Sequence, residues 1–267
     1  MTREELYLQM KAKGSMLCVG LDTDYAKIPE CVKAGRSVGE AVLEFNRRII
    51  DATASHCVAY KPNLAFYESL GIEGLSVLDK TVDYLRTNHP EQFLIADAKR
   101  GDIGNTAKMY ARSLFSTFDF DAVTISPYMG SETVTPFLEY PGRYAIVVAL
   151  SSNSSSADFQ TALKDGKPLY RVVMERMMEI STPENMMFVV GATKADKLKE
   201  IRQFCPDNFF LVPGVGAQGG SAEEVMSNGA NDKGGLLINS SRGVLYASAG
   251  DDFAQAAALS AAATARF

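Results

Sequence analysis

The feature that most constrains the fold is a regular alternation of short apolar runs with helical patterns along all 267 residues. Each run is short and apolar enough to be a buried strand of a parallel sheet. The predicted strands are residues 16–21, 57–61, 93–99, 122–126, 144–150, 186–190, 209–212 and 236–239. About eight strands alternating with helices are typical of a closed (β/α)8 TIM barrel. We therefore predict one α/β domain over residues 1–267 with a short N-terminal helix; a doubly wound open sheet is the alternative.

Composition excludes several classes of protein. The net charge of −5 and the pI near 5.2 argue against nucleic acid or an acidic membrane surface as the main partner. No apolar run approaches the roughly 18–20 residues of a membrane helix, and residues 1–5 are too polar to begin a signal peptide. The four cysteines are scattered, which indicates free thiols in the cytoplasm. The two histidines are isolated, which disfavours a histidine metal site or a Ser-His-Asp triad.

Charged side chains gather where predicted strands end. Asp97 and Lys99 share one face of the third strand if its side chains alternate, and Asp102 follows after Gly101. Burying such charges costs several kcal/mol or more unless they are paired or used in chemistry. A barrel brings the carboxyl ends of its strands to one mouth, where the following residues would meet: Asp22, Lys61, Asp97, Lys99 and Ser126. The alternative is a purely structural network of ion pairs.

Two later loops have the composition of an anion site. Residues 213–220, PGVGAQGG, contain glycines that let backbone N–H groups approach an anion, ahead of a predicted helix. Ser241 and Arg242 follow the eighth strand, and the loops after strands seven and eight of a barrel often bind phosphate. The alternative is two turn-rich loops with a surface arginine. Gly214, Gly216 and Gly219 also match a dinucleotide fingerprint, but that motif belongs after the first strand of its unit.

These residues resemble the orotidine 5′-phosphate decarboxylase family. The segment DAKRGDIGNT at residues 97–106 is similar to the family's signature, Asp-x-Lys-x-x-Asp. The resemblance continues in matching order through Asp22, KPN at 61–63, SPYMG at 126–130, residues 213–220 and Arg242. One departure is the sequence SSRG at 240–243, where many members have Gly-Arg-Ser. The resemblance covers essentially the whole barrel.

The resemblance implies a homodimeric barrel that converts orotidine 5′-phosphate to uridine 5′-phosphate and CO2, the last step of UMP biosynthesis, without cofactor or metal. Lys99 would protonate C6, and Asp97 would face the substrate's carboxylate. Lys61 and Asp22 would support Lys99 and the ribose hydroxyls. Asp102 and Thr106 would reach the active site of the neighbouring subunit, and Ser126 would contact the pyrimidine. The phosphate would be bound by Gln218, Ser241 and Arg242, and the loop after strand seven would close over the site as a lid.

Three rival functions fit parts of the pattern. Related barrels with the same Asp-x-Lys-x-x-Asp motif are magnesium-dependent sugar-phosphate enzymes, which keep an extra acid near the end of strand one or two. Here Lys61 ends strand two, which favours the metal-free reaction. A Schiff-base aldolase using Lys61 or Lys99, and a catalytically silent phosphate-binding or scaffold protein, are the others. Residues 151–168, which begin with a serine-rich tract, are expected to form a long mobile loop.

Overall fold

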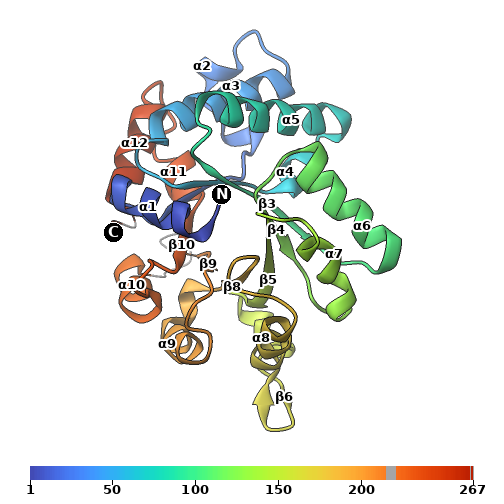
Figure 1. Ribbon diagram of the computed structural model, residues 1–267. Coiled ribbons are helices and arrows are strands. Elements are labelled where there is room, and N and C mark those ends of the chain that lie inside the picture. Colours follow the sequence, from blue (N-terminus) through green and yellow to red (C-terminus); the bar gives the residue numbers. More distant parts are fainter. Residues whose placement is uncertain (215–220, 265, 267) are drawn as a thin grey trace.

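The computed structural model describes residues 1–214, 221–264 and 266. Eight parallel strands close into a barrel in the order β1-β10-β9-β8-β5-β4-β3-β2, with helices packed around it (Figure 1). The barrel strands are β1 (Leu17–Leu21), β2 (Ala59–Pro62), β3 (Phe93–Arg100), β4 (Ala122–Ile125), β5 (Tyr144–Leu150), β8 (Met186–Val190), β9 (Phe210–Val212) and β10 (Leu236–Ser240). The predicted (β/α)8 fold is confirmed.

Helices of ordinary length follow most of the strands. They are α1 (Arg3–Lys13), α3 (Val38–Thr53), α5 (Gly71–Asn88), α6 (Gly104–Arg112), α8 (Leu169–Glu179), α9 (Ala195–Phe204), α10 (Ala222–Gly229) and α12 (Phe253–Ala263). Short helices lie at α2 (Glu30–Lys33), α4 (Leu64–Glu68), α7 (Thr135–Leu138) and α11 (Arg242–Leu245). Local signals start several of them: Ser37 and Glu40 form a capping box at α3, which satisfies two backbone donors that lack partners inside the helix.

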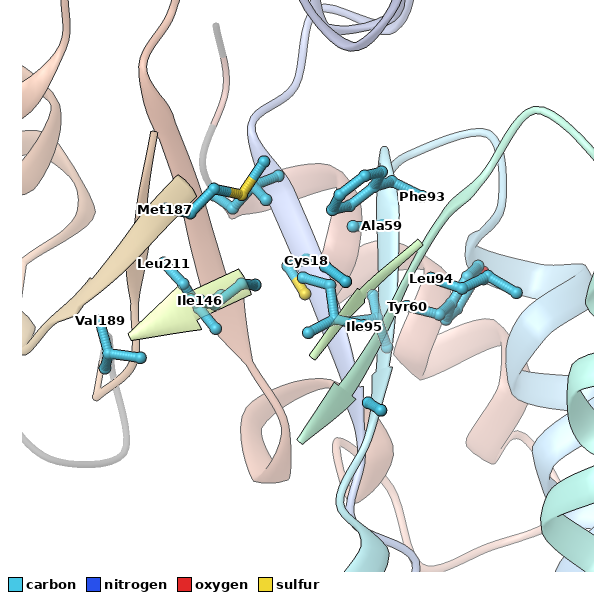
Figure 2. Packing of buried hydrophobic residues seen from close by; sticks show 14 of the residues in the cluster. Cys18, Ala59, Tyr60, Phe93, Leu94, Ile95, Ile146, Met187, Val189 and Leu211 are labelled. Atoms are coloured by element: carbon cyan, nitrogen blue, oxygen red, sulfur yellow. The ribbon is translucent and has the colours of Figure 1, made fainter. Parts of the chain in front are cut away.

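The core lies inside the barrel and between the barrel and its helices. Cys18, Ile95 and Ile146 come from three different strands, are fully buried, and belong to the packed cluster in Figure 2. Most strand residues are buried on both faces, as expected when helices cover a parallel barrel. The apolar strands thus fix the barrel, and polar residues are concentrated at its rims.

A partly buried arginine links three segments near the amino-terminal ends of β9 and β10. The guanidinium of Arg202, on α9, donates to the backbone carbonyls of Gly229, Cys205, Pro206, Asn208 and Gly235 at 2.7–3.1 Å. It also lies 3.8 Å from the centre of the Phe210 ring. Arg202 therefore ties the ends of α9 and α10 to the start of β9.

Two predicted elements differ from the structure. Residues 151–168 are not a featureless loop: they contain a 3-10 helix, Ser154–Asp158, and a hairpin of β6 (Leu163–Lys164) and β7 (Lys167–Pro168) that projects from the barrel (Figure 1). Asp165 and Gly166 both have positive φ, which the tight two-residue hairpin turn requires. Residues 103–118, whose sequence pattern predicts one helix, form α6 followed by a π-helical turn, Ser113–Thr117.

Candidate active site

Four charged side chains meet at the carboxyl ends of β1, β2 and β3. Lys61 is almost fully buried, and its Nζ lies 2.8 Å from Asp97 Oδ2 and 3.8 Å from Asp22 Oδ1. Lys99 Nζ lies 2.5 Å from Asp97 Oδ1, so Asp97 stands between two ammonium groups. The structure therefore brings together Asp22, Lys61, Asp97 and Lys99 in alternating charge.

A bulge in β3 positions Asp97 and Lys99. Strands β3 and β4 pair at Ala96 with Val123, and next at Arg100 with Ile125. Three residues of β3 thus stand opposite one residue of β4, and Lys99 takes a left-handed φ of 45° that non-glycine residues rarely adopt. The side chains of Asp97 and Lys99 meet because of this bulge, whereas we had predicted simple alternation along a strand.

The pairing shifts the pKa values in the direction that preserves both charges. Burial alone raises the pKa of Asp97, but Lys61 and Lys99 outweigh it and hold that pKa well below its usual range. Burial alone lowers the pKa of Lys61, but the carboxylates of Asp97 and Asp22 more than offset it and raise that pKa. Asp97 is therefore a carboxylate, and Lys61 an ammonium, at neutral pH.

Two tyrosines that sequence reasoning missed hold the backbone around Asp22. Tyr67 of α4 donates its hydroxyl to the carbonyl of Leu21 at 3.1 Å. The Tyr246 hydroxyl donates to the carbonyl of Asp22 at 3.2 Å and accepts from the backbone N–H of Asp24 at 2.8 Å. The Oδ1 atom of Asp22 is buried and has no hydrogen-bond donor among the described residues. The two tyrosines thus hold the backbone at Asp22, and its Oδ1 keeps the longer ion-pair contact with Lys61.

Ser126 directly follows β4 and lies next to the carboxyl end of β3. Its backbone N–H donates to the carbonyl of Arg100 at 2.8 Å. It also lines a cavity of about 550 Å³ whose walls are mostly apolar and aromatic. The lining comes from the ends of β4 and β5, the following loop, and α8: Ser126, Pro127, Tyr128, Val148, Phe159 and Leu169 are among it. The lining combines apolar and aromatic side chains with the polar Ser126 and Gln160, which suits a heterocyclic ring.

Asp102 and Thr106 lie apart from this cluster. Asp102 Oδ1 accepts from the backbone N–H of Ile103 at 2.8 Å, and no ion pair joins Asp102 to a lysine within the described ranges. Thr106 is exposed on α6. Large apolar side chains are exposed around them, on α6 and on the loop after β4: Ile103, Met109, Tyr110, Tyr128 and Met129.

The predicted phosphate residues are described in part. Arg242 is exposed at the first position of α11, directly after β10. Ser241 Oγ accepts from Asn239 Nδ2 at 3.3 Å and packs against Gly20 of β1. Gln218 and the rest of 215–220 lie outside the described residues.

The described part of the chain contains neither a cluster of metal-binding side chains nor a helix that could span a membrane. No group of three or more His, Cys, Asp or Glu side chains in 1–214, 221–264 and 266 could hold a metal ion. Within the same ranges, no helix is both long and apolar enough to cross a bilayer.

Comparison with known proteins gives full-length matches. The profile of the orotidine 5′-phosphate decarboxylase / HUMPS family matches residues 15–258. An orotidine 5′-phosphate decarboxylase of Parabacteroides distasonis is 53% identical over 96% of this chain and 91% of its own length. An orotidine 5′-phosphate decarboxylase of Porphyromonas gingivalis is 50% identical over 100% of this chain and 96% of its own length. The solved OMP decarboxylase of Leishmania donovani superimposes with a TM-score of 0.79 at 36% identity, covering 96% of this chain and 95% of the other.

Proposed function

This chain belongs to the orotidine 5′-phosphate decarboxylase / HUMPS family, and on that premise we propose that it decarboxylates orotidine 5′-phosphate to uridine 5′-phosphate, the final step of pyrimidine biosynthesis. The observation that carries the proposal is the alternating cluster in which Lys61 and Lys99 flank Asp97 at the barrel mouth. The relatives named above span nearly the whole chain, and their names supply the substrate.

Lys99 is the proton donor in this proposal. The C6–carboxylate bond breaks, CO2 leaves, and the bonding electron pair stays on C6. The Lys99 ammonium then gives its proton to C6 and forms uridine 5′-phosphate. The neutral amine regains a proton from water, to which its side chain is open at 55% exposure. Lys61 keeps its charge throughout because it is buried between two carboxylates.

Electrostatics from one ammonium cannot account for the whole rate enhancement. A positive charge about 4 Å from the developing carbanion stabilises it by roughly 4 kcal/mol at an effective dielectric of 20. Enzymes of this kind need a further contribution, and binding energy from the part of the substrate that does not react can supply it. We assign that contribution to the phosphate, bound by Arg242, Ser241 and Gln218.

The rest of the nucleotide fits the features between these two ends. We assign the ribose hydroxyls to Asp22, whose Oδ1 pairs with Lys61 at 3.8 Å but accepts no hydrogen bond from the described residues. The cavity lined by Ser126 accepts the pyrimidine, with the serine as its polar contact. In this arrangement the charged cluster faces C6 while the phosphate is held on the β10 side of the mouth.

We further propose a homodimer in which Asp102 and Thr106 complete the partner's site. Both residues lie amid exposed apolar side chains on α6 and the loop after β4, a surface that a second copy would cover. The test is complementation between Lys99→Ala and Asp102→Asn. Random mixed dimers regain about a quarter of the wild-type activity if each site uses both subunits. Absence of any regain would exclude the shared site.

The proposed reaction is tested by incubating the protein with orotidine 5′-phosphate and following the ultraviolet band as uridine 5′-phosphate forms. We expect turnover that excess chelator does not change, and its near-complete loss in Lys99→Ala while circular dichroism shows a folded protein. Chelator-sensitive turnover would favour the magnesium-dependent relatives. Trapping of substrate on a lysine by borohydride would instead indicate a Schiff-base enzyme. Near-normal turnover by Lys99→Ala would refute the role of this lysine.

A further inference from the structure

The bulge in β3 leaves a gap in the barrel's hydrogen-bond ladder, and a side chain of β4 fills it. The pairing between β3 and β4 stops at Ala96 with Val123 and resumes at Arg100 with Ile125. Thr124 is the single β4 residue between these two pairs. The backbone N–H of Lys99 donates to Thr124 Oγ1 at 2.9 Å, so a hydroxyl serves as its acceptor.

The same hydroxyl also binds the catalytic carboxylate. Thr124 Oγ1 lies 3.0 Å from Asp97 Oδ1, to which it donates its one proton, and 3.5 Å from the more distant carbonyl of Ala96. Thr124 is buried, so water does not compete for this proton. Asp97 Oδ1 is also the atom that Lys99 Nζ contacts at 2.5 Å. One hydroxyl therefore fixes both the backbone of Lys99 and the carboxylate that its ammonium meets.

We propose that Thr124 is a positioning residue that holds Lys99 and Asp97 in register for proton delivery; this rests on the proposed function of Lys99. The left-handed φ of Lys99 costs free energy, and its N–H must find an acceptor. The Thr124 hydroxyl supplies that acceptor and at the same time orients Asp97. Without it, the lysine backbone relaxes and the ammonium moves away from the position from which it protonates the substrate.

A sequence signal for this role exists. Thr124 is the one hydroxyl residue in an otherwise apolar strand, AVTI, and it follows the charged strand directly in the sheet. A valine would be nearly isosteric and equally suited to a buried strand. The threonine is therefore explained by its hydroxyl group and not by packing.

The test compares variants that keep or remove the hydroxyl. We expect Thr124→Val to lower kcat for orotidine 5′-phosphate by about 10- to 100-fold with KM changed less than about threefold, because misplacement of a reacting group affects the chemical step. Thr124→Ser keeps the hydroxyl and should stay within about threefold of wild-type kcat. Thr53→Val is the matched control, since Thr53 is also buried but bonds to Ile49 and Tyr60 instead.

Three outcomes would overturn the proposal: wild-type kcat in Thr124→Val, an equal loss in Thr124→Ser, or an equal loss in Thr53→Val. Thermal unfolding shows whether each variant is folded. If Thr124→Val is unfolded, Thr124→Ala, which also lacks the hydroxyl, is compared with Thr124→Ser instead. The wild-type protein is assayed in parallel. Failure of the wild-type protein to turn over the nucleotide would refute the proposed function, whereas an active wild type with an equally active Thr124→Val refutes only the role of Thr124.

Discussion

The strained backbone at Lys99 allows a direct test of how the site is maintained. Lys99 has a φ of 45°, a conformation that costs an L-residue roughly 1–2 kcal/mol and a glycine almost nothing. Lys99→Ala and Lys99→Gly both remove the ammonium and its contact with Asp97. The difference in stability between them therefore depends mainly on the backbone strain at this position. The greater freedom of glycine in the unfolded chain offsets part of it, so we expect Lys99→Gly to be about 1 kcal/mol more stable than Lys99→Ala.

The assay is unfolding in urea followed by far-ultraviolet circular dichroism, with thermal unfolding as a second measurement. For 267 residues the entropy of unfolding is about 0.56 kcal/mol per kelvin, so about 1 kcal/mol corresponds to a Tm difference of roughly 2 °C. Both variants should be inactive. An alanine variant as stable as the glycine variant, or more stable, would show that the backbone at this position stores no strain.

Three other predictions follow from described contacts. Arg202→Met leaves carbonyls of the α9–β9 region without a donor, so it should lower the free energy of unfolding by about 3–5 kcal/mol and Tm by roughly 5–9 °C in calorimetry. Gly20→Ala would place a Cβ 2.0 Å from Ser241 Oγ, so KM for the phosphorylated substrate should rise at least about fivefold in steady-state kinetics; an unchanged KM would separate Ser241 from the phosphate site. Folding lowers the pKa of Asp97, so ionised Asp97 stabilises the folded protein above about pH 4, the ordinary pKa of an aspartate. This stabilisation is lost as the pH falls through the pKa of Asp97 in the folded protein. Folding raises the pKa of Lys61, so protonated Lys61 stabilises the folded protein below about pH 10.4, the ordinary pKa of a lysine. This stabilisation is lost as the pH rises through the pKa of Lys61 in the folded protein. The stability difference between wild type and Asp97→Asn, measured by urea unfolding, should therefore be constant from about pH 5 to pH 9 and shrink below about pH 4.

The barrel was predictable because its strands begin as short apolar runs and several of its longer helices, such as α3, are amphipathic. The strand over Met186–Val190 has the predicted bounds. The convergence of Asp22, Lys61 and Asp97 followed from the same logic, since parallel strands end at one mouth.

The remaining features depend on contacts between segments distant in sequence. The bulge at Lys99 is a mismatch of register between β3 and β4, and a single strand's pattern carries no information on register with its neighbour. The roles of Tyr67 and Tyr246 depend on side chains that reach across from other elements to the Asp22 backbone. The hairpin at 163–168 did have a local signal, the Asp165–Gly166 pair, which the serine-rich composition before it obscured.

The bulge in β3 also bears on how such an enzyme can be altered. Pairing with β4 stops at Ala96 and resumes at Arg100 with Ile125, so residues 97–99 form a bulge with paired residues on both sides. We expect substitutions at residues 97–99 to leave the alignment of the flanking strands and the closure of the barrel in place, although a new residue 97 must still pair with buried Lys61. The residues proposed to react and the residues that hold the barrel together are therefore different, neighbouring parts of β3. A design that needs a different acid or base can therefore change residues 97–99 and keep the rest of the barrel sequence.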